Sequence, residues 1–255
     1  MKTISFLNLK GGTGKTVSAA NFAYNLAEFH KKRVLLIDGD KQGNSSMYFR
    51  VHDRNRAGLV DALTVPRFAD FDIESAITPT EHPRLAVITS NMDLYRTDRQ
   101  LEEIGGIESA QILKNALEQI KDDFDYCVID HAPAIDNIVI NGLMATDDVI
   151  IPVRVDDFSF SGMGDLLEQI DFARGGNPSL TVKGCFITHY QNNEVNRQGR
   201  DLLKQRDLCP VFETVIHYNK TVSESTFYKL PLHKYNGRSW ATIEYKKLVA
   251  EYLSM

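Results

Sequence analysis

A chain of 255 residues, 43% hydrophobic and 25% charged, has the balance of a globular protein with one large α/β core or two small ones. The net charge of −5 gives no overall attraction to nucleic acid, so any DNA contact requires a local basic patch. Three separated cysteines without a C-x-x-C pair argue against disulfide, zinc and iron–sulfur frameworks and fit a reducing cytoplasm. The start is too short and polar for a signal peptide, and no apolar run approaches the roughly 20 residues of a membrane-spanning helix.

Short apolar runs alternate with amphipathic stretches along the chain. Strands are expected at residues 4–8, 33–38, 85–89, 126–130, 149–152, 182–188 and 211–214. Most are apolar throughout, as is typical of strands buried on both faces. Helices are expected at residues 15–29, 57–64, 92–103, 109–121, 136–145, 160–173, 196–205 and 238–253. The alternation predicts one α/β domain over residues 1–255, with a single doubly wound, mostly parallel sheet and helices on both faces.

The first strand leads into KGGTGKT at residues 10–16 and then into a helix. The glycines allow backbone N–H groups to turn around phosphate oxygens at the helix start, where the helix dipole also favours an anion. Lys15 is expected to reach the β- and γ-phosphates, and Thr16 to place its hydroxyl on Mg²⁺. The alternative is a glycine-rich turn with solvated lysines. The expected nucleotide-binding residues are Lys10, Gly11, Gly12, Thr13, Gly14, Lys15, Thr16 and Val17.

Acidic residues follow two of the expected strands. RVLLIDGD ends with Asp38 and Asp40, and DYCVID ends with Asp130. In open α/β sheets ligands bind at the carboxyl ends of strands, where these carboxylates would meet Thr16 and a Mg²⁺-nucleotide. Thr16, Asp38 and Asp130 are therefore the expected metal-site residues, and Asp40 the residue that orients an attacking water. For any one aspartate taken singly, a helix cap or a turn is the competing interpretation.

These motifs together resemble the deviant-Walker ATPases of the ParA/Soj and MinD type. KGGTGKT resembles the signature loop, VLLIDGDKQGNSS the second acidic motif, and FDYCVIDHAPA the Walker B strand. The resemblance is strongest to ParA/Soj partition proteins and runs over nearly the whole chain. VIIPVRVDDFSFSGM, VFETVIHYNKTVSES and HKYNGRSWATIEYKKL resemble later blocks of the family, in the right order.

The resemblance implies a slow ATPase with ATP and Mg²⁺ as cofactors and with Lys10, Lys15 and Asp40 as catalytic residues. Lys10 is implied to cross the interface of an ATP-bound homodimer and contact phosphate in the partner subunit. The ATP dimer is implied to bind duplex DNA without sequence preference. The protein is therefore expected in the cytoplasm, associated with the nucleoid when ATP is bound. A ParB-like centromere-binding protein is implied to stimulate hydrolysis. Because the chain begins directly at the first strand, we expect no N-terminal helix-turn-helix domain.

The sequence also departs from the family pattern. Thr13 replaces a small apolar residue, and Gly39 and Lys41 flank Asp40 where an apolar residue and a proline are usual. Tyr218 and Trp240 are among the residues at C-terminal places where arginines are common. A local surplus of positive charge nevertheless predicts a DNA-binding patch, with a solvated helix surface and a buried Trp240 as the alternative. Its basic residues are Lys220, Lys229, Lys234, Arg238, Lys246 and Lys247, and a second group comprises Arg197, Arg200, Lys204 and Arg206.

The last stretch, WATIEYKKLVAEYLSM, is amphipathic at helical spacing. Because it carries Glu244 and Glu251 and ends with the fold, we interpret it as a closing core helix, so no stable membrane association is expected. His131 is expected to line the turn beside the phosphate site, and His189 and Tyr190 to border the adenine. Two other functions remain open: a MinD-like or protein-cargo-positioning ATPase, and a P-loop ligase or reductase-activating ATPase.

Overall fold

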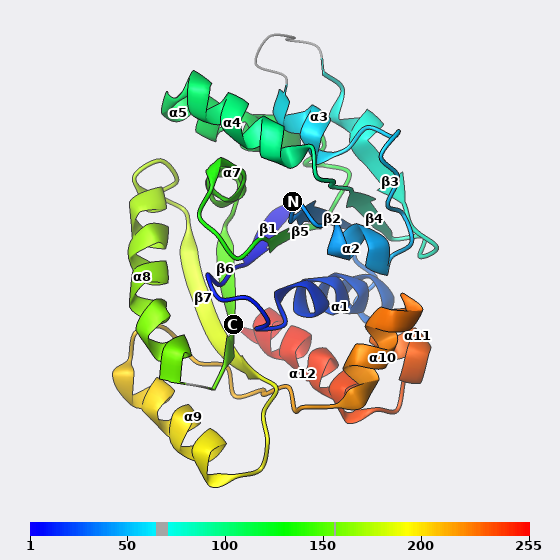
Figure 1. Cartoon of the computed structure of the whole chain (residues 1–255). Helices are drawn as coiled ribbons and strands as arrows, with labels where there is room; N and C mark the ends of the chain where they lie inside the picture. Colours follow the sequence, from blue (N-terminus) through cyan, green and yellow to red (C-terminus); the bar gives the residue numbers. More distant parts are fainter. Residues whose placement is uncertain (65–70, 156) are drawn as a thin grey trace.

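One seven-stranded sheet runs through the protein (Figure 1). The computed structural model describes residues 1–64, 71–155 and 157–255, with the backbone alone over 157–161. The strand order is β3-β4-β2-β5-β1-β6-β7, and every pairing is parallel except that of β3 with β4. The strands are β1 (Lys2–Phe6), β2 (Val34–Gly39), β3 (Ile77–Pro79), β4 (Leu85–Ile88), β5 (Tyr126–His131), β6 (Asp148–Arg154) and β7 (Thr181–Thr188).

Helices cover both faces of this sheet, so the predicted doubly wound architecture is confirmed (Figure 1). Alternate strand residues point to opposite faces because the side-chain period of a strand is two. Leu36 and Val128 therefore pack with α1 and α12, whereas Leu35 and Ile129 pack with α3, α4, α6 and α7. The helices are α1 (Lys15–Phe29), α2 (Asn44–Tyr48), α3 (Leu59–Thr64), the 3₁₀ helix η1 (Ile73–Ala76), α4 (Leu94–Ile104), α5 (Gly106–Ala110), α6 (Ile112–Glu118), α7 (Asn137–Met144), α8 (Asp157–Arg174), α9 (Glu194–Arg206), α10 (Lys220–Tyr228), α11 (Leu232–Asn236) and α12 (Trp240–Ser254).

The expected strand at residues 211–214 is wrong. Val211 forms an isolated bridge with Cys185, and Phe212 donates its N–H to the carbonyl of Cys185. The next two N–H groups, of Glu213 and Thr214, donate to the carboxylate of Glu251 on α12 instead of to a strand. The segment therefore runs beside β7 without extending the sheet.

Several short elements escaped the sequence pattern. Strand β3 is three residues long and contains Pro79, which an edge position tolerates because one side of an edge strand needs no N–H donor. The expected helix at 109–121 is divided into α5 and α6, and α2, α10 and α11 are additional. In contrast, α1 has the predicted bounds. Over the described residues, no helix is both long and apolar enough to cross a membrane.

The topology brings the ends of three strands together. Phe6, the last residue of β1, lies opposite Asp130 on β5, and Asp130 in turn lies opposite Asp38 on β2. Because these neighbouring strands are parallel, the loop after β1 and both carboxylates share the carboxyl edge of the sheet. The helix α1 also begins at this edge.

Candidate functional site: a nucleotide-phosphate loop with buried carboxylates

The loop between β1 and α1 has the backbone that phosphate binding needs. Gly12 (φ 73°) and Gly14 (φ 81°) lie in the left-handed region, which a side chain would strain. Gly14 is the N-cap of α1 and carries no capping side chain, so N–H groups at the helix start are left for a ligand. Thr188 at the end of β7 donates its hydroxyl to the carbonyl of Thr13 at 2.9 Å, which ties the loop to the sheet.

Both lysines of the loop are held by hydrogen bonds within the first 15 residues. The Nζ atom of Lys15 donates to the carbonyl oxygen of Lys10 at 3.0 Å, so this side chain folds back over the glycines. Lys15 is buried, with 7% of its surface exposed. Burial lowers its pKa, and the charges of Asp130 and Asp40 oppose that shift. Lys10 is half-buried, and its N–H donates to Oδ1 of Asn8 at 2.9 Å.

Asp38 is fully buried at the end of β2. Its Oδ2 accepts hydrogen bonds from the N–H and the hydroxyl of Ser46, both at 2.7 Å. Burial raises the pKa of Asp38 to about 6, although the bonds from Ser46 favour the charged form. Ser46 ends the motif VLLIDGDKQGNSS, but the sequence predicted no role for it. Its position eight residues after Asp38, at the start of α2, gave no sign that the chain folds back.

Asp130 is equally buried and sits next to Asp38. Its Oδ2 accepts the hydroxyl of Ser45 at 2.8 Å, and its Oδ1 has no hydrogen-bond partner among the described residues. Burial first, and then the charge of Asp38, raises the pKa of Asp130 to about 7, against the effect of the Ser45 and Thr16 hydroxyls. An unpaired buried carboxylate oxygen beside a second carboxylate suits a hard cation such as Mg²⁺.

These residues suit a cation that keeps ligands other than protein side chains. Among the described residues, no group of three or more His, Cys, Asp or Glu side chains has the arrangement of a complete metal site. Mg²⁺ is usually held by one or two protein groups together with water and substrate phosphates. Thr16, half-buried in the first turn of α1, and Asp130 are two such protein groups, and Asp38 lies next to Asp130 on the neighbouring strand.

Asp40 lies one residue beyond β2, in a loop held from several sides. Its Oδ1 accepts the N–H of Gln42 at 2.9 Å, and its carbonyl accepts the N–H of Gly43. Gly39 before it has no room for a side chain, because a Cβ would lie 2.9 Å from the carbonyl oxygen of Asp130. The departure at Gly39 thus permits close packing of β2 against β5, and Asp40 itself is half-buried at the mouth of the site.

Lys41 anchors the same loop to two helices. Its Nζ lies 2.7 Å from Oδ2 of Asp136 and 3.3 Å from Oδ2 of Asp98, and its side chain is 13% exposed. Asp136 caps α7 by accepting the N–H of Val139 at 3.0 Å. The residue that replaces the family proline therefore joins the Asp40 loop to α4 and α7.

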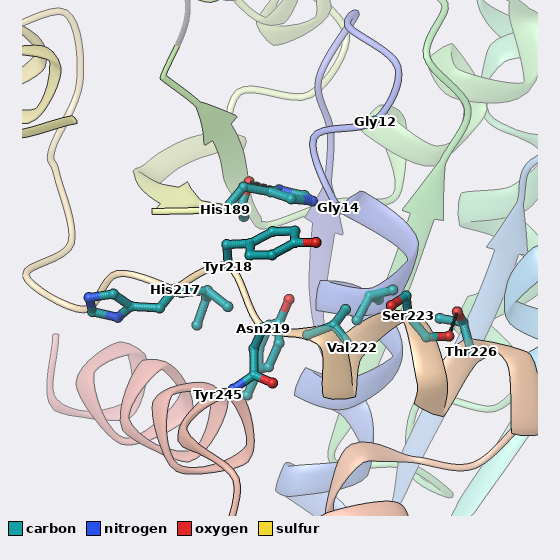
Figure 2. Close-up of a pocket in the computed structure, with 13 residues that line it drawn as sticks. Gly12, Gly14, His189, His217, Tyr218, Asn219, Val222, Ser223, Thr226 and Tyr245 are labelled. Carbon is teal, nitrogen blue, oxygen red and sulfur yellow. Dashed lines mark hydrogen bonds between the residues drawn. The ribbon is translucent and has the colours of Figure 1, made fainter. Parts of the chain in front are cut away.

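A cavity of about 260 Å³ adjoins Gly12 and Gly14 (Figure 2). His189 and Tyr218 extend toward Gly14 there, whereas the lining residues of α10 lie across from them. The walls are largely apolar and aromatic, as is typical of a site for a nucleotide base. The lining residues are Gly12, Gly14, Val17, Thr188, His189, Ile216, His217, Tyr218, Asn219, Val222, Ser223, Thr226 and Tyr245.

Two of the expected histidine and tyrosine positions differ in the structure. His189 lines the cavity, but Tyr190 is buried beside it and packs edge-on against His217. His131 does not line the turn beside the phosphates. It is buried within β5, pairs with the hydroxyl of Ser5 at 2.8 Å, and has a pKa lowered to about 3 by burial and then by Lys15. It is a neutral core side chain that a Cβ on Gly142 would strike.

The candidate DNA-binding residues all lie in or next to α10, α11 and α12. These helices are on the same side of the sheet as α1 (Figure 1). Lys246 is half-buried with its Nζ 3.8 Å from the ring centre of Phe29, and Lys234 pairs with Glu81; the other four are exposed. Trp240 is 68% exposed, not packed in the core. In the second basic group, Arg197 pairs with Glu194, and Arg200 and Lys204 both pair with Glu213.

Comparisons with known proteins identify the family. A model described as an AAA domain matches residues 1–182. The chromosome-partitioning ATPase Soj of Treponema pallidum is 32% identical over 98% of this chain and 96% of its own, and the chromosome partitioning protein ParA of Caulobacter vibrioides is 30% identical over 100% and 94%. Cobyrinic acid a,c-diamide synthase from Mycobacterium smegmatis, solved with ADP and magnesium, has a TM-score of 0.82 at 25% identity over 98% of this chain and 93% of that one. The chain therefore belongs to the ParA/Soj-type family of partition ATPases.

Proposed function

We propose that this protein is a DNA-partition ATPase that hydrolyses Mg-ATP in the site between β1, β2 and β5. The observation that carries the proposal is the convergence of Lys15, Asp38 and Asp130 at one edge of the sheet, with an unpaired carboxylate oxygen. One sheet through the described chain also supports a single ATPase domain over residues 1–255. ATP and Mg²⁺ are the cofactors of this site.

The residues divide the work by position. The N–H groups around Gly11, Gly12 and Gly14 cradle the phosphates, and Lys15 neutralises charge on the β- and γ-phosphates. Thr16 and Asp130 would hold Mg²⁺, whose charge when bound would offset that of the phosphate oxygens, and Asp38 lies next to Asp130. Asp40, half-buried at the mouth, orients the attacking water. The base and ribose occupy the cavity beside Val17.

Lys10 serves a second subunit. It is half-buried at the start of the loop, and its carbonyl oxygen accepts the amine of Lys15. Two copies that face each other across bound ATP would each place a Lys10 amine near the partner's γ-phosphate, so the triphosphate holds the homodimer together. Hydrolysis and phosphate release then weaken that dimer.

The DNA surface is the exposed side of α10, α11 and α12. Lys220, Lys229, Arg238 and Lys247 are exposed there, and Trp240 adds an exposed aromatic ring. The carboxylates of Glu244 and Glu251 on α12 accept N–H groups of the 213–217 segment, so their oxygens are engaged within the fold. Such a surface contacts phosphates without reading sequence. In the cytoplasm, the ATP form would then associate with the nucleoid, where a ParB-like partner stimulates hydrolysis.

A protein cargo is the second candidate. Tyr218 and Trp240 stand where the resemblance implies arginines, and Phe227 is 81% exposed beside Tyr228. Exposed aromatic groups of this kind favour contact with protein. A membrane cargo is less favoured, because the apolar face of α12 is used internally: Leu248, Val249 and Tyr252 are buried against the core.

The deciding experiment uses Asp40→Ala, which should bind ATP and hydrolyse it slowly. Its affinity for a non-specific duplex is measured with Mg-ATP and with Mg-ADP at two salt concentrations. Binding that requires ATP and weakens steeply with salt supports the partition function. A dimer that forms with ATP but binds no DNA would contradict it and favour a protein cargo.

A further inference from the structure

The segment between α9 and α10 is fastened to α12 by two glutamates. Glu251 accepts the N–H groups of Glu213 and Thr214 at 2.6 and 2.9 Å. Glu244 accepts the N–H of His217 at 2.9 Å, and its other oxygen lies 2.5 Å from Nδ1 of the same residue. Residues 244 and 251 are two turns apart, so both carboxylates lie on one face of the helix.

The Glu244 contact lies at the cavity wall. His217, Tyr218 and Asn219 are consecutive lining residues, and Tyr245 next to Glu244 lines the same cavity. Figure 2 shows Tyr218 extending toward Gly14 while the ring of His217 points away. Tyr190 at the end of β7 accepts the N–H of Tyr218 at 2.9 Å. The wall is therefore held by β7 on one side and by Glu244 on the other.

We infer that Glu244 is a positioning residue for the nucleotide base: it fixes the 217–219 wall and thereby sets the affinity of the cavity for the base half of ATP. Glu244 is 7% exposed, so its bonds to His217 are not exchanged cheaply for bonds to water. Without the carboxylate, the N–H of His217 loses its hydrogen-bond partner. Tyr218, the next residue, is then held only by its own N–H bond to the carbonyl of Tyr190. This inference rests on the proposed function, because it assumes that a nucleotide occupies the cavity.

The phosphate end should not respond. Lys15, Asp38 and Asp130 make their contacts with residues of the loop, α2 and the sheet, and Glu244 takes part in none of these contacts. Loss of Glu244 should therefore raise the KM for ATP and leave kcat unchanged. It should also leave unchanged the inhibition by inorganic tripolyphosphate, which carries the phosphates without a base.

Glu251 supplies a matched control. It is on the same helix and accepts backbone N–H groups of the same segment, but Glu213 and Thr214 lie outside the cavity lining. Glu251→Ala should lower the melting temperature as Glu244→Ala does, without changing the KM for ATP. A merely structural role for Glu244 would make the two variants alike.

The experiment measures steady-state ATP hydrolysis and tripolyphosphate inhibition in Glu244→Ala, Glu244→Gln and Glu251→Ala. We expect the KM for ATP to rise about tenfold in Glu244→Ala and about threefold in Glu244→Gln, whose amide oxygen still accepts the N–H of His217. If Glu244→Ala fails to fold, Glu244→Gln alone tests the inference against Glu251→Ala. An equal KM in Glu244 and Glu251 variants, or a parallel loss of tripolyphosphate inhibition, would overturn it. A wild-type chain that hydrolyses no ATP would instead contradict the proposed function.

Discussion

The phosphate end and the base end of the candidate site are built in opposite ways. The phosphate end comes from residues 10–46 and one further strand end, and it buries charge: Lys15, Asp38 and Asp130 lie together out of solvent. The base end is a largely apolar cavity whose walls come from α1, the end of β7, the 216–226 segment and α12. One half is nearly continuous in sequence and the other is assembled by the fold.

This difference predicts which kinetic quantity each half controls. Buried charges at the phosphate end act on groups whose charge changes during hydrolysis, so their loss should lower kcat. Contacts with the base do not touch the reacting phosphate and bind substrate and transition state alike, so their loss should raise KM. Mutations at the two ends therefore test the comparison directly.

The largest effect is expected from Asp130→Asn at the phosphate end. An amide cannot replace the carboxylate for Mg²⁺, so kcat should fall by about 10²-fold or more. The same change should stabilise the nucleotide-free protein at pH 8 by about 2 kcal/mol, because it removes a buried charge next to Asp38. Chemical denaturation of both proteins without nucleotide measures the gain.

The pH dependence follows from the pKa of Asp130, raised to about 7 in the folded protein from 3.8. Between these values the folded chain holds a proton on Asp130 that the unfolded chain has released, so the contribution of this carboxyl to stability is fully present below pH 4 and is lost as pH rises through 7. Asp38, raised to about 6, adds in the same direction. The stability difference between wild type and Asp130→Asn should vanish near pH 4. A difference that is constant from pH 4 to 8 would contradict this account.

A smaller effect is expected from Lys41→Met. The change leaves Asp136 and Asp98 without the ammonium group between them and frees the Asp40 loop from α4 and α7. A misplaced Asp40 should lower kcat about tenfold with little change in KM. Lys2→Met is the control, since Lys2 pairs with Asp148 at the amino end of β6. Equal rates in both variants would show that Lys41 does not position Asp40.

The comparison also explains what the sequence revealed. The bounds of α1, the glycine loop and the aspartates at strand ends were predictable because each depends on residues within one turn or one strand. Ser45 and Ser46 were missed as partners of Asp130 and Asp38, since only the short helix α2 turns their hydroxyls back to the sheet. Local periodicity carries no information about such a return.

At the base end, the sequence pointed to Gly12, Gly14, Val17 and His189 but not to the walls from the 216–226 segment and α12. The pattern at 211–214 is that of a strand, yet the N–H groups of Glu213 and Thr214 donate to Glu251 on α12, which lies 38 and 37 positions further along the chain. From the sequence, Glu251 and Glu244 indicated only that the last helix is not membrane-bound. His131 was misplaced because a strand-end position does not state which face the side chain takes, and it faces Ser5 in the core.

The smallest effect is expected from Tyr245→Phe at the base end. The hydroxyl of Tyr245 meets Oγ of Ser18 in α1 at 3.0 Å and so joins α12 to the helix that starts at the phosphate loop. Its loss should cost about 1 kcal/mol of stability and raise the KM for ATP about threefold, with kcat unchanged. Tyr252→Phe is the matched control, because that hydroxyl donates to Asp148 at 2.7 Å, away from the cavity. It should lose stability without a change in KM. A fall in kcat in Tyr245→Phe would break the separation of the two ends, since it would mean that the α1–α12 contact also orders the phosphate loop.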